Sequence, residues 1–133
     1  MLAHWTGVYW NGQELGFKIF QQAVRRLKTR FDNLVWMKLS ELARYWAAKE
    51  LTRIERNGGA IQFRAPFGCA DFTVRFESKE NWVPSLRVNQ ERRDLQEVNG
   101  PLKLTSGAWC QEGKSVSACF ALPKGKSELT NAA

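Results

Sequence analysis

Hydrophobic residues recur at two different spacings along the chain, and the change from one to the other comes near residue 52. Over residues 15–31 apolar side chains return every three or four positions, which predicts an amphipathic helix that starts near Gly12 with Asn11 as its cap. After Thr52 the period falls to two, the spacing of half-buried strands. The pattern predicts a helical first part followed by a strand-rich second part.

Two short apolar runs, residues 1–5 and 34–37, have the length of strands and lie on either side of this helix. A second helix is expected after them, with Ser40 as its cap and its end near Glu50 or Leu51. Strand, helix, strand and helix in this order make a β-α-β-α unit, in which the strands pair in parallel. Parallel strands must be covered on both faces, so the unit requires neighbours from upstream sequence or from a partner chain.

Residues 52–125 are expected to form a small all-β domain. The segment Asn57-Gly58-Gly59 between two alternating runs is a strong hairpin signal. The expected strands cover residues 53–56, 60–64, 72–76, 86–88, 95–98, 102–104, 108–110 and 116–122. Short strands at this spacing favour an antiparallel β-sandwich or an open barrel, and residues 126–133 are expected to be a frayed tail. The predicted fold class is α+β, a partial β-α-β-α unit followed by a small antiparallel β-sandwich-like domain.

The chain of 133 residues has room for one ordinary domain or two small pieces, and it is basic. It holds 20 Lys and Arg against 13 Asp and Glu, a formal net charge of +7. The basic residues are spread from Lys18 to Lys126 and mixed with acids, so a basic surface is expected rather than a long cationic run. Nucleic acid is therefore an unexpected partner, although a β-domain with a basic surface that binds carbohydrate or nucleic acid remains the alternative function.

The three cysteines, Cys69, Cys110 and Cys119, contain no pair with the C-x-x-C spacing of a zinc or redox site. Buried free thiols are expected, with a bridge between Cys110 and Cys119 left open. No apolar run approaches the roughly 18 residues of a membrane span, so no membrane partner is expected. The N-terminus shows no basic region followed by an apolar core, so no secretion signal is expected either, and the compartment stays undetermined.

The single histidine, His4, follows the first expected strand, and in α/β folds active sites gather at the carboxyl ends of strands. An imidazole at this place can act as a general acid near neutral pH. The alternative is a core histidine that donates to a backbone carbonyl. Trp82 and Trp109 lie outside the clearest alternating runs, so they are candidates either to stack on sugar rings or to fill a small core.

Three stretches of the first part resemble the C-terminal end of a polysaccharide deacetylase (NodB-like) domain: Leu2-Ala3-His4-Trp5, the loop over residues 7–12, and residues 35–43. The resemblance covers residues 1–51 and implies that they are the last elements of an irregular β/α barrel, with residues 52–125 as an accessory domain. It implies a divalent metal such as zinc held by one Asp and two His, and an Asp that acts as base on the metal-bound water. It also implies a late His that protonates the leaving amine, and His4 matches that histidine.

With one histidine the chain cannot supply the metal site that the resemblance implies, so no cofactor is expected in this chain. The expected function is that of a C-terminal fragment of a deacetylase-like, carbohydrate-active protein that is inactive alone. The expected partners are polysaccharide and, through the apolar faces of residues 1–51, a further polypeptide or a second copy.

Overall fold

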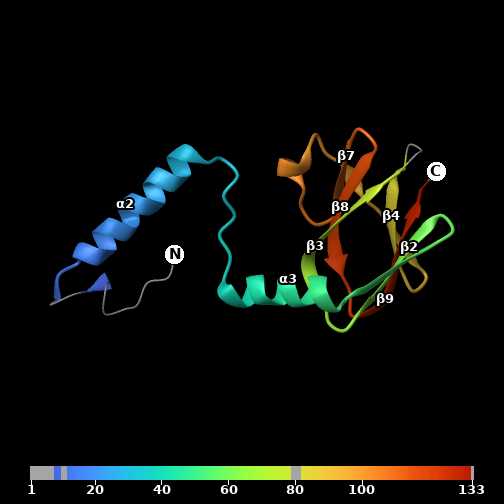
Figure 1. Cartoon of the computed structure of the whole chain (residues 1–133), viewed down its shortest axis with the longest axis horizontal. Helices are drawn as coiled ribbons and strands as arrows, with labels where there is room; N and C mark the ends of the chain where they lie inside the picture. The colour runs from blue at the N-terminus through green and yellow to red at the C-terminus, as the bar shows by residue number, and fades with distance from the viewer. Residues whose placement is uncertain (1–7, 10–11, 79–81, 133) are drawn as a thin grey trace. The chain divides into compact units, whose positions relative to one another are not determined.

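The computed structural model describes residues 8–9, 12–78 and 82–132, which contain helices and strands (Figure 1). The chain divides into two compact units, residues 1–36 and residues 37–133. The described part of the first unit contains the long helix α2 (Leu15–Arg30), and that of the second contains the helix α3 (Leu39–Leu51) and nine strands. The sequence predicted a boundary near residue 52, whereas α3 groups with the strands because it packs on them.

Helix α2 begins at Leu15 rather than near Gly12. Gly12 has φ +72°, a left-handed conformation that a helical residue does not adopt, and Asn11, the expected cap, lies outside the described residues. Lys28 and Arg30 occupy the last turn, where their positive charge interacts favourably with the helix dipole. The predicted amphipathic helix is therefore confirmed, with a later start.

The strand predicted over residues 34–37 is wrong, because residues 33–38 have no regular secondary structure. Val35 is 78% exposed and Trp36 is 57% exposed. A short apolar run forms a strand only when its backbone groups bond to a neighbouring strand, and this run pairs with no strand of the described chain. The other strand of the expected β-α-β-α unit, residues 1–5, lies outside the described residues.

Helix α3 starts after Lys38, whose backbone N–H donates to the Glu41 carboxylate at 2.7 Å. Ser40 therefore lies inside the first turn and is not the cap that the sequence predicted, while the predicted end at Leu51 is confirmed. The inner side of α3 packs on the strands through Ala48, which is fully buried, and Tyr45, whose ring lies 6.4 Å from that of Phe72.

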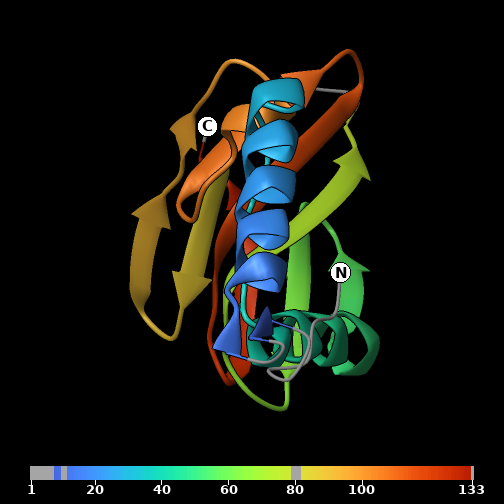
Figure 2. The same ribbon diagram turned by 90° about the vertical axis from the view of Figure 1, so that its left-hand side faces the viewer.

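The nine strands form two sheets, which confirms the α+β class. The five-stranded sheet is antiparallel throughout and has the order β1 (Arg53–Asn57), β2 (Ala60–Ala65), β9 (Gly125–Asn131), β4 (Pro84–Val88) and β5 (Glu91–Asp94). The four-stranded sheet has the order β3 (Cys69–Glu77), β8 (Ser115–Leu122), β7 (Ala108–Glu112) and β6 (Gln96–Glu97), with β6 and β7 parallel. Figure 2 shows the green β1–β2 hairpin and the ochre β4–β5 hairpin at opposite sides of the unit.

Two predictions for the second half are wrong. Residues 126–131 are not a frayed tail, because β9 lies between β2 and β4 and its Leu129 is fully buried. Residues 102–104 are not a strand, because the 3₁₀ helix η2 (Pro101–Lys103) occupies this place. Pro101 has no N–H for a strand ladder, and the N–H of Lys103 donates to Gly100.

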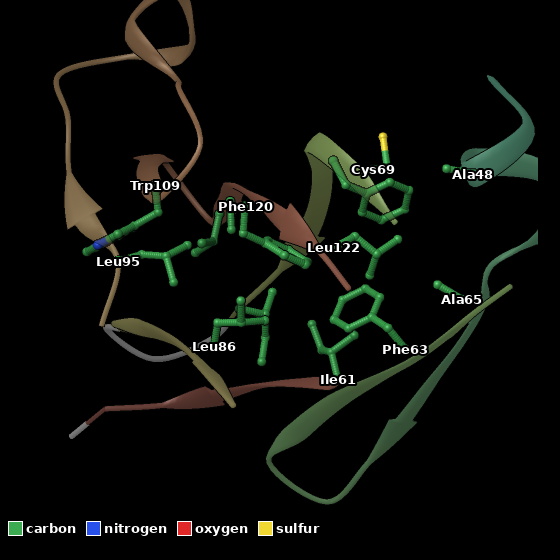
Figure 3. Packing of buried hydrophobic residues seen from close by; sticks show 14 of the residues in the cluster. Ala48, Ile61, Phe63, Ala65, Cys69, Leu86, Leu95, Trp109, Phe120 and Leu122 are labelled. Carbon is green, nitrogen blue, oxygen red and sulfur yellow. The ribbon is translucent and has the colours of Figure 1, made fainter. Parts of the chain in front are cut away.

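The core lies between the two sheets, as Figure 3 shows for a part of its residues. Alternate residues of β2, namely Ile61, Phe63 and Ala65, point into it from one sheet, and Phe72 and Phe120 reach it from the other. The rings of the last two lie 6.1 Å apart at an angle of 67°. Two sheets that share one apolar interior agree with the predicted β-sandwich.

Candidate functional site

The structure does not bring the predicted site residues together. His4 lies outside the described residues. Trp82 and Trp109 are only 7% and 5% exposed and belong to the hydrophobic core, where the ring of Trp82 packs edge to face on Phe76 at 4.8 Å. Sugar stacking by these two side chains is therefore corrected to a packing role, because neither ring presents a free face.

The metal that the resemblance implies finds no donor set among the described residues, where no group of three or more His, Cys, Asp and Glu converges. Cys69, Cys110 and Cys119 are free and buried, which confirms the expected thiols and excludes the bridge that was left open. Burial raises the pKa of all three thiols above the ordinary value. Thiols with raised pKa values are poor nucleophiles and poor metal ligands at neutral pH.

The strongest candidate site is a hollow of about 400 Å³ on the outer face of the five-stranded sheet, the face turned away from the core. Because side chains alternate along a strand, the residues between the core positions of β2, Gln62 and Arg64, point to this outer face. Four adjacent strands and the turn after β4 supply the side chains around the hollow. They are Arg53, Glu55, Gln62, Arg64, Arg87, Asn89, Lys126 and Glu128.

Three cations stand in one cross-strand row of this hollow. Arg53 of β1 lies directly opposite Arg64 of β2, and Arg64 lies directly opposite Lys126 of β9. All three are exposed, and none makes an ion pair within the described part of the chain. Like charges directly opposite each other destabilise a sheet, so this row is unfavourable unless an anion lies over it.

The next row supplies groups that orient a ligand. Glu55, Gln62, Glu128 and Arg87 lie opposite one another across β1, β2, β9 and β4. The Arg87 guanidinium pairs with the Glu128 carboxylate at 3.2 Å, which fixes both side chains. The amide of Gln62 and the carboxylate of Glu55 remain available as a donor and an acceptor for hydroxyl groups. The hollow therefore combines unpaired positive charge with neutral and acidic hydrogen-bonding groups.

A second hollow of about 910 Å³ lies between the β4–β5 hairpin and the end of β8. Its floor contains core residues such as Leu86, Phe120 and Leu122, which are themselves at most 6% exposed. At its rim, Arg93 is already paired with Glu91 at 3.0 Å. It holds fewer unsatisfied charges than the first hollow and is therefore the weaker candidate.

The sequence reasoning did not single out Arg53, Arg64 or Lys126. Part of the signal was present, because the two-residue turn Gly58-Gly59 fixes the register that places Arg53 opposite Arg64. The hairpin signal says nothing of Lys126, because the sequence predicts a tail for its segment and not a strand beside β2.

No model of a protein family, no curated protein and no solved structure matches the chain. Among the described residues no helix combines the length and the apolar character required to cross a bilayer. The hollow itself presents unpaired guanidinium and ammonium groups beside an amide and carboxylates.

Proposed function

We propose that the unit of residues 37–132 is a binding module for acidic carbohydrate, which it holds on the outer face of its five-stranded sheet. The observation that carries the proposal is the row of Arg53, Arg64 and Lys126, three unpaired cations in register within one hollow. This function is the carbohydrate-binding form of the alternative that the sequence raised, a β-domain with a basic surface, and it does not use Trp82 or Trp109.

An anionic ligand offsets the repulsion among the three cations of this row. A carboxylate between Arg53 and Arg64 accepts charge-assisted hydrogen bonds from both guanidinium groups, which match its planar geometry. Each hydrogen bond to a charged group contributes about 1.5–3 kcal/mol when its partners are not otherwise paired. Lys126 adds a third positive charge at the other side of Arg64.

The other groups of the hollow favour a sugar over a nucleic acid. Glu55 and Glu128 accept hydrogen bonds from the several hydroxyl groups of a sugar, whereas a nucleic-acid backbone presents repeated phosphates and few hydroxyl donors. Proteins that bind single-stranded nucleic acid stack bases on exposed aromatic rings. Among the described residues, Phe63 is the one aromatic residue that lines the hollow, and it is 1% exposed.

The test is calorimetric titration of the whole chain with a short oligomer of galacturonic acid, with the methyl ester of that oligomer, and with a single-stranded oligonucleotide. We expect binding of the acid and weakening by about tenfold or more in Arg64→Gln, the loss of one charge-assisted contact. Arg75→Gln is the matched control, because Arg75 is an exposed mid-strand arginine of the other sheet.

Three results contradict the proposal. Equal binding of the acid and its ester shows that charge is not recognised. Tighter binding of the oligonucleotide, with a steep loss on added salt, assigns the surface to nucleic acid. Equal weakening by the Arg64 and Arg75 variants shows that the whole basic surface acts without a defined site.

Kinship with polysaccharide deacetylases is a separate proposal that depends on the resemblance of residues 1–51. Under this second proposal, the binding module is the accessory domain of a larger carbohydrate-active protein. Since the described residues hold no donor set for the metal, we derive no hydrolytic step. Translation of the DNA upstream of Met1 in the same frame tests this kinship. An Asp-Asp motif and an H-x-x-x-H motif in that translation support it. An in-frame stop close upstream of Met1, together with a good start signal, opposes it.

A further inference from the structure

Helix α2 carries apolar side chains that the described residues of its own unit cover only in part, through Tyr9, whose ring stacks on that of Phe17 with centroids 6.1 Å apart. Its apolar side chains lie at spacings of three and four residues, and no residue of the helix is buried. Leu15 and Ile19 are 61% and 59% exposed, and Phe20 and Leu27 are more than a third exposed. Contiguous apolar surface of this kind marks a place where a protein or a lipid surface binds.

The charged side chains of α2 are all of one sign. Residues 15–30 contain five basic side chains, Lys18, Arg25, Arg26, Lys28 and Arg30, and no acid. None of the five forms an ion pair within the described chain. Figures 1 and 2 show α2 as one uninterrupted helix.

We propose that α2 binds the surface of a membrane that contains anionic lipids. In this position the helix lies in the plane of the interface, with Ile19, Phe20 and Leu27 among the upper acyl chains and the basic residues among the headgroups. Basic amphipathic helices with Phe and Leu on their apolar face bind in this way. Long Lys and Arg side chains reach the headgroups while their stems cover apolar surface.

The charge distinguishes this occupant from a second copy of the chain. Pairing two α2 helices through their apolar faces leaves all ten basic side chains without a partner, because neither helix offers an acid to them. An anionic surface attracts the same charges, with about 1 kcal/mol contributed by each Lys or Arg near the surface. The segment that follows adds Trp36, which is 57% exposed, and tryptophan is favoured at the headgroup level.

The sequence-based expectation of no membrane partner rested on the lack of a segment that crosses a bilayer and on basic residues that are spread and mixed with acids. The 16-residue α2 is too short for that role. Binding in the plane of the interface requires a different pattern, which is one apolar face and one basic face.

The experiment is co-sedimentation of the whole chain with vesicles of pure phosphatidylcholine and with vesicles that contain phosphatidylglycerol. We expect binding to the second only, and a fall of about tenfold or more in the double variant Arg25→Glu and Arg26→Glu. Ile19→Asp should reduce binding by about tenfold as well, because the side chain no longer enters the acyl region. Circular dichroism of each variant checks that the fold is retained.

Two control variants make the outcome specific. Leu102→Asp places the same charge on an apolar side chain of η2 that is 72% exposed, and it should leave binding almost unchanged. The double variant Arg53→Glu and Arg64→Glu removes cations from the carbohydrate-binding face and should weaken binding less than the α2 double variant. The proposal is overturned if the wild-type chain does not bind the anionic vesicles, or if the Ile19→Asp and Leu102→Asp variants bind them equally. It is also overturned if light scattering shows a dimer of the wild-type chain that the Ile19→Asp substitution dissociates.

Discussion

The rings of Phe63 and Phe120 contact each other edge to face between the two sheets, with centroids 5.3 Å apart and planes inclined by 65°. Each side chain is 1% exposed, and Phe72 lies against both. This group of three rings joins β2, β8 and β3, and it therefore connects the two sheets at the centre of the core.

Removal of one of these rings should destabilise the unit strongly. Phe63→Ala leaves a cavity among groups that relax only in part, so we expect a loss of about 3–5 kcal/mol in the free energy of unfolding. Urea denaturation followed by fluorescence measures it. Ile54→Ala on the edge strand β1 is the control, since Ile54 is 49% exposed and should cost much less. Equal losses in the two variants contradict the assignment of Phe63 to the core.

Leu129 provides a test of strand β9. Its side chain is fully buried between residues of β2 and β4, Ile61 and Leu86, which are its register partners. Leu129→Ala should lower the free energy of unfolding by about 2–5 kcal/mol, whereas Leu102→Ala at an exposed position should change it by less than about 0.5 kcal/mol. A frayed segment would give the small value at both positions, so thermal and urea melts of the two variants decide between the alternatives.

These strands show which parts of the fold the sequence could predict. The β1–β2 hairpin was predictable because Gly58-Gly59 fixes a local turn, and it is confirmed with Arg53 opposite Arg64. Strand β9 was not, because its segment contains Leu129 as its one large apolar residue, so no alternation is visible. The strand exists because β2 and β4 offer backbone partners on both sides, and such distant pairing leaves no local signal.

The candidate site likewise depends on pairing between strands that are distant in the sequence. Its cations are ordinary surface residues in the sequence, and they become a row only when register brings Arg64 between Arg53 and Lys126. The prediction that two tryptophans stack on sugar rings failed for the opposite reason. Trp82 and Trp109 stand outside regular patterns, yet tertiary packing buries them. Exposure of an aromatic side chain outside a clean periodic run cannot be inferred from the sequence alone.

Asp94 should titrate at a lower pH than an ordinary aspartate. Its pKa is lowered first by a hydrogen bond from Ser85 and then by one from Arg92, whose Nε lies 3.0 Å from the carboxylate. A carboxyl group with a lowered pKa in the folded state contributes stability above its unfolded pKa, and this contribution is lost as the pH falls through the folded value. Carbon NMR of the carboxyl groups should show the low pKa, and Ser85→Ala should raise it toward the ordinary value. An unchanged pKa in that variant contradicts the assigned cause.

The three cysteines should be unreactive in the folded protein. Burial raises the pKa of each thiol, so at neutral pH the nucleophilic thiolate is scarce and the sulfur is covered. We expect slow labelling by DTNB in buffer and fast labelling of all three in urea. Since the folded pKa values are raised, their contribution to stability is complete below the unfolded pKa and decreases as the pH rises above it. Rapid labelling of Cys110 under native conditions would contradict its burial of 99%.

The position of β9 between β2 and β4 determines when this sheet can close during protein synthesis. The ribosome releases β2 and β4 well before β9, and until β9 arrives both strands present unpaired backbone groups along one side. Exposed strand edges of this kind template association with other chains. Nascent copies on one messenger RNA are therefore most prone to aggregate in the interval before residue 131 emerges, and this is the interval in which chaperones would protect them.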